Sequence, residues 1–175
     1  MLTIPMDQVG KEIVRGVRDE LLQANLGDDF PLSGSTEDNV PTNTTGIGTT
    51  VIGLVHKDDF NVGKSQKDDL IVCIGIPKSS PEDTVLLDDD DIINQQDIYT
   101  ILKVSGVSEV LPIGSKGAAN EAAQLAETVG LKFELFDKQS INIDKSGGPS
   151  TCVIVSCNPD SVTQLMNDLK IPINI

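Results

Sequence analysis

The feature that most constrains the fold is the stretch VLPIGSKGAANEAAQLAETVG, which runs from Val110 to Gly130. Its apolar beginning ends at the glycine-rich sequence Gly114-Ser115-Lys116-Gly117, and a run of good helix formers follows. Free backbone amides at the start of a helix, preceded by glycines, form a site for anions, and Lys116 adds a positive charge. A turn that only joins two elements has the same pattern. The sequence therefore leaves two interpretations of this loop open, a phosphate cradle and a plain turn.

Helical and strand-like patterns alternate along the rest of the chain. A helix is expected from about Asp7 to Asn25, because apolar residues recur every four positions from Val9 to Leu21. Strands interleaved with helices predict an α+β fold, an α/β arrangement with a mixed sheet flanked by helices. The other helices are expected at about 92–104, 116–130 and 160–169, and the strands at 49–56, 69–76, 131–136, 151–157 and, at an edge, 171–175. A short apolar segment follows Gly106 and reaches Pro112.

The net charge excludes some classes of partner. It is −14 at neutral pH, whereas a sequence-independent grip on nucleic acid needs a basic surface, and an anionic membrane would repel such a chain. No apolar run approaches the ~20 residues of a membrane span. The N-terminus lacks the charged and apolar regions of a signal peptide. We therefore expect a cytoplasmic protein that binds neither nucleic acid nor membrane.

The three cysteines lie in apolar, strand-like runs. Cys73, Cys152 and Cys157 are accordingly expected to be buried thiols in a reducing compartment. Cys152 and Cys157 are an odd number of positions apart, so they should point to opposite faces of one strand and cannot clamp a metal.

Two nucleotide-binding motifs fail on their spacing. Gly63-Lys64-Ser65 is similar to the end of a P-loop, but Asp58 occupies the position of the required earlier glycine. Gly46-Ile47-Gly48 begins a dinucleotide fingerprint, but Val51 stands at its third glycine. The sole histidine, His56, is expected on the surface, and the clustered His and Cys of a zinc site are absent from the sequence.

A second loop has a composition suited to ligand binding. Small hydroxyls, a glycine and carboxylates are dense there, and such groups can hold Mg²⁺ and phosphate oxygens. A solvated loop or a helix cap has the same composition, so both interpretations stay open. The residues are Ser33, Gly34, Ser35, Thr36 and Glu37, followed by Asp38.

Four segments, taken in order, resemble a known superfamily. They are PLSGSTEDNVPTNTTGIGTTVIGLV, VGKSQKDDLIVCIGIPKSS, VLPIGSKGAANEAAQLAETVGLKFEL and SGGPSTCVIVSCNPDSVTQLMNDL. In this order they resemble the aminoimidazole ribonucleotide (AIR) synthase-related, or PurM-like, superfamily. Within it, the chain is most similar to the α-ribazole kinase-like proteins of cobalamin salvage, which carry a Gly-Ser-Thr-Glu loop and a Pro-x-Gly-Ser-Lys-Gly loop.

The resemblance implies a division of the chain into two parts. Residues 1–62 would be the C-terminal tail of an AIR synthase-like N-terminal, ATP-binding domain, and 63–175 a complete AIR synthase-like C-terminal domain. By the same resemblance, most of the ATP-binding domain, with its metal-binding aspartates, would lie outside this chain. Ser35 stands where many relatives have an acid, and Glu37 is the nearby carboxylate left for a metal.

The resemblance also implies roles for the two loops. It places Ser33, Gly34, Ser35, Thr36 and Glu37 on the nucleotide and metal side. It places Gly114, Ser115, Lys116 and Gly117 at the phosphate or substrate end.

The function implied is ATP- and Mg²⁺-dependent phosphoryl transfer to a nucleoside-like substrate, with α-ribazole as the specific case. The chain alone is expected to be inactive without the missing half. The expected partners are a second copy of the chain, most simply as a dimer, or a complementary chain carrying the N-terminal half, together with a small phosphorylated or nucleoside-like ligand. The alternative is a non-catalytic domain that binds a phosphorylated ligand or a partner subunit.

Overall fold

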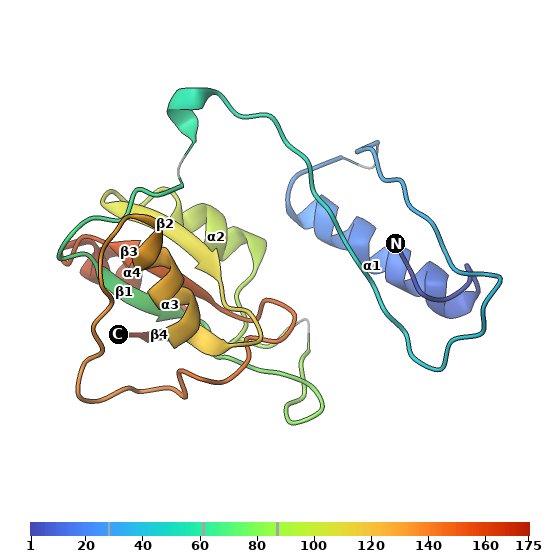
Figure 1. Cartoon of the computed structure of the whole chain (residues 1–175). Coiled ribbons are helices and arrows are strands. Elements are labelled where there is room, and N and C mark those ends of the chain that lie inside the picture. The colour runs from blue at the N-terminus through green and yellow to red at the C-terminus, as the bar shows by residue number, and fades with distance from the viewer. Residues whose placement is uncertain (28, 61, 87) are drawn as a thin grey trace. The chain divides into compact units, whose positions relative to one another are not determined.

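The computed structural model of the protein describes residues 1–27, 29–60, 62–86 and 88–175. It consists of two units, Met1–Asp58 and Asp59–Ile175 (Figure 1). The resemblance places a boundary at 62/63. It remains a prediction that the two units correspond to the N-terminal and C-terminal domains of the AIR synthase-related superfamily.

The first unit is built on one helix. Helix α1 (Gln8–Gln23) begins as expected after Asp7, whose side chain accepts a hydrogen bond from the amide of Gly10 at 3.0 Å. Leu2 and Gly10 are the buried residues of this unit among those described. The apolar side of α1 is therefore incompletely covered in this chain.

The segment after α1 is irregular and is tied to the N-terminus. The amide of Leu2 donates to the carbonyl of Ser35 at 2.9 Å, and the amide of Thr3 donates to the carbonyl of Gly46 at 3.0 Å. These bonds hold the loop that contains Ser33–Glu37. A 3₁₀ turn at Lys57–Asp59 follows the exposed stretch 49–56.

The second unit is a four-stranded sheet with helices on both faces. The strands are β1 (Leu70–Ile74), β2 (Val107–Pro112), β3 (Val153–Cys157) and β4 (Ile173–Asn174), in the order β2-β3-β1-β4. All three pairings are antiparallel. The helices are α2 (Gln95–Ile101), α3 (Gly117–Thr128) and α4 (Ser161–Asp168). The α+β class is thus confirmed.

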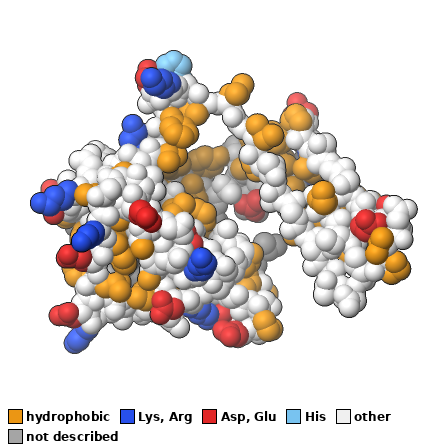
Figure 2. Space-filling view, viewed as in Figure 1, with side chains coloured by type: hydrophobic (Ala, Val, Ile, Leu, Met, Phe, Trp, Pro, Cys, Tyr) orange, Lys and Arg blue, Asp and Glu red, His pale blue; other side chains and the backbone are white. Residues whose placement is uncertain are grey.

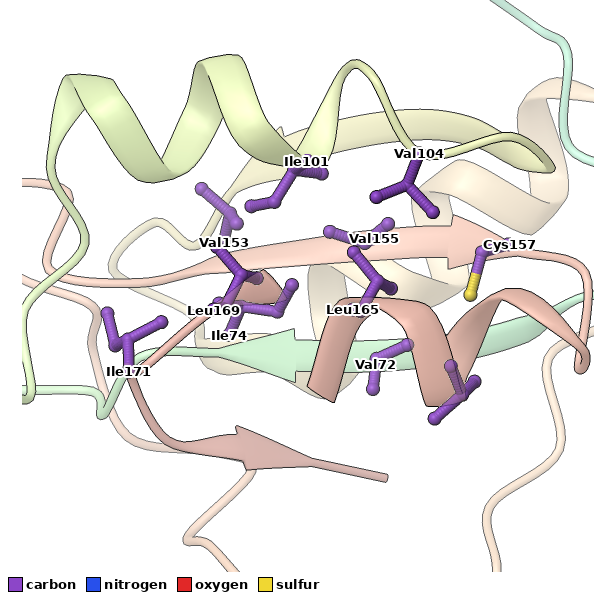
Figure 3. Packing of buried hydrophobic residues seen from close by; sticks show 11 residues of the cluster. Val72, Ile74, Ile101, Val104, Val153, Val155, Cys157, Leu165, Leu169 and Ile171 are labelled. Atoms are coloured by element: carbon purple, nitrogen blue, oxygen red, sulfur yellow. The ribbon is translucent and has the colours of Figure 1, made fainter. Parts of the chain in front are cut away.

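The sheet separates two hydrophobic clusters, because successive side chains of a strand point to opposite faces. One face packs against α2 and α4, and Figure 3 shows Ile101, Leu165 and Val104 directed toward Val153 and Val155. The other face packs against α3. This second cluster consists of Cys73, Ile113, Ala118, Ala122, Leu125, Cys152 and Ile154.

Three expectations about strands are wrong. Residues 49–56 and 131–136 are described throughout, and neither segment forms a strand. The sheet is antiparallel rather than mixed. An alternating apolar pattern produces a strand only where a neighbouring strand can pair with it, and these two segments have none.

Candidate functional site

The loop Ser33–Glu37 is largely exposed, and its carboxylate already has backbone partners. Oε1 of Glu37 accepts hydrogen bonds from the amides of Asn39 and Val40, at 2.7 and 3.0 Å. In the described part of the chain, no three His, Cys, Asp or Glu side chains are grouped so that they could hold a metal ion. The structure therefore places Glu37 as a cap of its own loop, and its metal role stays a prediction.

The loop Gly114–Gly117 forms a turn into α3, and a neighbouring segment lies across the start of the helix. Lys116 is exposed and makes no capping bond. The amide of Ala119 donates to the carbonyl of Ile143 at 3.1 Å. Gly117 has a φ of +81°, and a Cβ there would collide with the carbonyl oxygen of Ile143. The glycine is thus required by close contact between two backbones.

A carboxylate also lies beside this turn. A Cβ built at Gly114 would lie 3.1 Å from Oε1 of Glu121. Negative charge near the amides disfavours an anion, and one amide of the helix start is already bonded to a carbonyl. Of the two interpretations left open by the sequence, this geometry favours the plain turn over the phosphate cradle.

A pocket of about 660 Å³ lies directly beyond this turn. It is bounded by the alanine-rich side of α3, by the sheet face that α3 covers, and by the segment 131–143. Apolar side chains reach the surface on this side of the unit (Figure 2). The volume lies within the range of small-molecule sites, ~300–1,000 Å³. The apolar side chains that line it include Ile71, Ala118, Ala122, Leu125, Phe133 and Ile154.

One polar group of the pocket is the carboxylate of Asp69. Its Oδ2 accepts hydrogen bonds from the hydroxyls of Ser108 and Ser156, at 2.9 and 3.0 Å, and from the amide of Gln66 at 2.9 Å. Ser156 is buried in the middle of the sheet. Oδ1 of Asp69 makes no hydrogen bond to any described residue, so it is available to a ligand.

Another polar residue of the lining is Asn174 on the edge strand β4. Its Oδ1 accepts a hydrogen bond from Oγ of Ser140 at 2.8 Å, which ties the segment 131–143 to the sheet. Nδ2 of Asn174 is buried without a hydrogen-bond partner among the described residues. Such groups are rare, because an unmade hydrogen bond costs roughly 1–3 kcal/mol.

A network of charged side chains lies outside the pocket. Nζ of Lys78 donates to both oxygens of Asp89, at 2.9 and 2.7 Å, and to Asp91 at 2.8 Å. These bonds raise the pKa of Lys78 and lower that of Asp89. Lys145 pairs with Asp83 at 2.7 Å and, with a backbone amide, lowers the pKa of that carboxyl group. Each cation is paired, so the network fixes loops rather than supplying a free charge.

The Gly63-Lys64-Ser65 segment binds a carboxylate of its own chain. The amide of Gly63 donates to Oε1 of Glu109 at 2.7 Å, and the amide of Ser65 donates to Oε2 at 2.9 Å. Burial acts to raise the pKa of Glu109, but these bonds and one from the amide of Lys64 outweigh it, and the pKa is lowered. The backbone amides of this segment, which could bind an anion, thus already donate to a carboxylate of the same chain.

The cysteines are free and buried, as the sequence predicts. Cys152 and Cys157 belong to clusters on opposite faces of the sheet, also as predicted. A hydrogen bond with Cys152, together with burial, raises the pKa of Cys73, and burial raises the pKa of Cys157 to about 11. The thiols of Cys73 and Cys157 therefore stay protonated at neutral pH and are poor nucleophiles, whereas the hydrogen bond with Cys73 lowers the pKa of Cys152.

Sequence reasoning missed the pocket and its polar residues. Two signals point to them. A serine interrupts the buried run of β3 at Ser156, and small residues repeat along one side of α3 at Ala118, Ala122 and Ala126. Small side chains on a covered helix face leave volume that larger ones would fill.

No family model matches the chain, and neither does any curated protein or solved structure. Among the described residues, no helix has both the length and the apolar character needed to cross a bilayer.

Proposed function

We propose that the Asp59–Ile175 unit binds a nucleoside-like small molecule in the pocket beside α3. The observation that carries this proposal is the pocket itself, a chamber of about 660 Å³ with apolar walls from α3 and the sheet and with polar side chains such as Asp69 in its lining. Apolar walls with a few placed polar groups are typical of small-molecule sites. A largely apolar bicyclic base attached to ribose, as in α-ribazole, has the matching chemistry.

We further propose that the chain is the substrate-side part of an AIR synthase-related enzyme that transfers a phosphoryl group from ATP, with Mg²⁺, to this nucleoside. The support is the resemblance of the four sequence segments. The loop Gly114–Gly117 then serves the substrate end, since Ala118 and Ala119, which follow it directly, line the pocket. The loop Ser33–Glu37 belongs to the nucleotide side in this proposal. Phosphoryl transfer depends on positioning and charge neutralisation, and in this proposal a complementary ATP-binding part supplies the metal-binding aspartates.

Calorimetric titration of the chain with α-ribazole tests the binding proposal. We expect saturable binding that Ala119→Phe abolishes, because the new ring would fill the pocket. Ala123→Phe is the matched control, since Ala123 is exposed on the same helix and does not line the pocket. Absence of binding, or equal loss in both variants, contradicts the proposal. Mixing the chain with a complementary ATP-binding half and following conversion of ATP to ADP tests the catalytic part.

A second function, binding to a partner subunit, is favoured by one observation. Val51 and Ile52 are each 87% exposed, and Leu54 is fully exposed. Three large apolar side chains in one extended segment resemble an interface more than a monomer surface. The partner is a second copy of the chain or the complementary half.

A further inference from the structure

The segment 49–56 of the first unit has the composition of a strand, but its backbone has no partner. Its backbone amides and carbonyls make no hydrogen bond to any residue that the structure describes. In an extended chain, Val51 and Val55 point to one side and Ile52 and Leu54 to the other. All four side chains are more than half exposed. An unpaired backbone that carries exposed apolar side chains is a template for pairing with another chain.

The apolar residues of this segment are arranged symmetrically about Gly53. Val51 and Ile52 precede the glycine, and Leu54 and Val55 follow it. If two copies pair antiparallel with Gly53 at the centre, Val51 lies opposite Val55 of the second copy, and Ile52 lies opposite Leu54. Directly opposed apolar side chains are the contacts that stabilise a pair of strands. The segment is therefore complementary to itself.

The distribution of charge favours the same arrangement. Asp, Glu, Lys and Arg make up 23% of the chain, but none of them lies in 39–56. Two copies with a net charge of −14 repel each other, and an uncharged segment opposes their contact least. Antiparallel pairing about Gly53 places Lys57 opposite Thr49, and Asp58 opposite Gly48. Parallel pairing in register would place each of these charges opposite the same charge in the second copy, which is destabilising.

The glycine at the centre has no role in the packing of the described chain. A Cβ built at Gly53 would meet no atom within 4 Å. Glycine inside a strand often marks a place where another backbone approaches closely. In the antiparallel arrangement, Gly53 lies opposite its own copy at the twofold axis.

We propose that residues 50–56 of two copies pair as an antiparallel two-stranded ribbon around a twofold axis at Gly53. This geometry rests on the subunit-binding function proposed above and identifies the partner as a second copy of the chain. Such pairing closes as a dimer, as most symmetric oligomers do. A ribbon of two short strands is a small interface, so the dimer is weak and forms at high protein concentration.

Disulfide cross-linking tests the direction and the register of the ribbon. Val51→Cys and Val55→Cys are prepared separately, one with a mass tag, and are oxidised alone and as a mixture at a concentration where sedimentation detects the dimer. We expect at least fivefold more cross-linked dimer between the two variants than within either one. Opposed residues meet the geometry of a disulfide, whereas the two copies of position 51 lie roughly 13 Å apart along the ribbon.

Two controls establish the background. Wild-type protein, whose three cysteines are free and buried, should not cross-link. Met166→Cys, another exposed apolar position, should not cross-link with Val51→Cys above the level of random collision.

The outcomes separate the ribbon from the subunit-binding function. Equal cross-linking within each variant alone means parallel pairing, and a dimer without any preferred cross-link means another interface. Either result overturns the ribbon and leaves binding to a second copy intact. Species that grow beyond the dimer also overturn it, because they show open-ended stacking of the segment. If the chain is a monomer at every concentration, both the ribbon and binding to a second copy are wrong.

Discussion

The carboxylate of Glu109 accepts hydrogen bonds from both the amide and the hydroxyl of Ser65, at 2.9 and 2.5 Å. Ser65 ends a Gly-Lys-Ser sequence that is similar to part of a phosphate-binding loop. Here the amides of that sequence surround a carboxylate from β2. The contact joins the segment before β1 to β2 and thereby fixes one rim of the pocket, which Ser65 lines.

Replacing Glu109 by Gln should lower the free energy of unfolding by about 1–2 kcal/mol at pH 7, because charged hydrogen bonds are replaced by weaker neutral ones. The pKa of Glu109 lies below its ordinary value of 4.5 in the folded protein. Its contribution is therefore complete above about pH 4.5 and is lost as the pH falls through the lower folded value. Urea unfolding between about pH 3 and 7 measures this. The wild-type and variant stabilities should converge in acid, whereas the exposed change Glu127→Gln should leave the free energy of unfolding at pH 7 nearly unchanged.

Gly117, the first residue of α3, and Gly130, just after its end, should respond differently to the same substitution. Both have positive φ, +81° and +71°, but only Gly117 faces another backbone, at Ile143 and Asp144. Gly130→Ala should cost about 1–2 kcal/mol for the left-handed conformation alone. Gly117→Ala adds a collision and should cost clearly more in chemical unfolding. Equal costs would mean that the segment 142–144 does not pack against the start of α3.

Inorganic phosphate should not bind at the turn Gly114–Gly117. The amide of Ala119 is already bonded to a carbonyl, and Glu121 lies beside Gly114. In amide NMR, the signals from Gly114 to Ala118 should stay in place at millimolar phosphate, in wild type and in Lys116→Glu alike. Shifts confined to these amides and abolished by Lys116→Glu would restore the phosphate cradle.

The exposed segment around Ile52 and Leu54 should promote self-association. Burying such side chains against a second copy removes apolar surface from water, at ~25 cal/mol per Å². Sedimentation should show a concentration-dependent dimer that the double change Ile52→Lys and Leu54→Lys weakens. Met166→Lys, an exposed apolar position on α4, should leave it unchanged. A strict monomer at high concentration would contradict this.

The sequence predicted correctly those helices and strands whose local residue pattern is enough to define them. Helix α1 begins after its Asp7 cap, and β3 lies within the most β-rich run, 151–157. The run 49–56 has a comparable pattern but no strand beside it, and that depends on the tertiary fold rather than on the local sequence. In 131–136, Phe133 is partly buried against the α3 cluster without strand pairing.

The candidate site was harder to predict because its groups come from distant parts of the chain. Asp69 precedes β1, Ser156 lies in β3, and Asn174 is almost at the C-terminus. Their proximity follows from the antiparallel register of β1 with β3 and β4, which no local pattern contains. The loops Ser33–Glu37 and Gly114–Gly117 could be selected from the sequence because the residues that suggest ligand binding are neighbours in the chain within each loop.

Methyl NMR with 5,6-dimethylbenzimidazole as the probe tests the central claim, the pocket beside α3, most directly. The sheet supplies an internal control, because Ile71, Ala122 and Ile154 face the pocket while Val72 and Leu165 belong to the cluster on the other side. We predict saturable shifts and contacts from probe protons to the first three methyl groups, with Val72 and Leu165 unchanged. Shifts confined to Val72 and Leu165, or no shift at a saturating concentration of the probe, would contradict the claim.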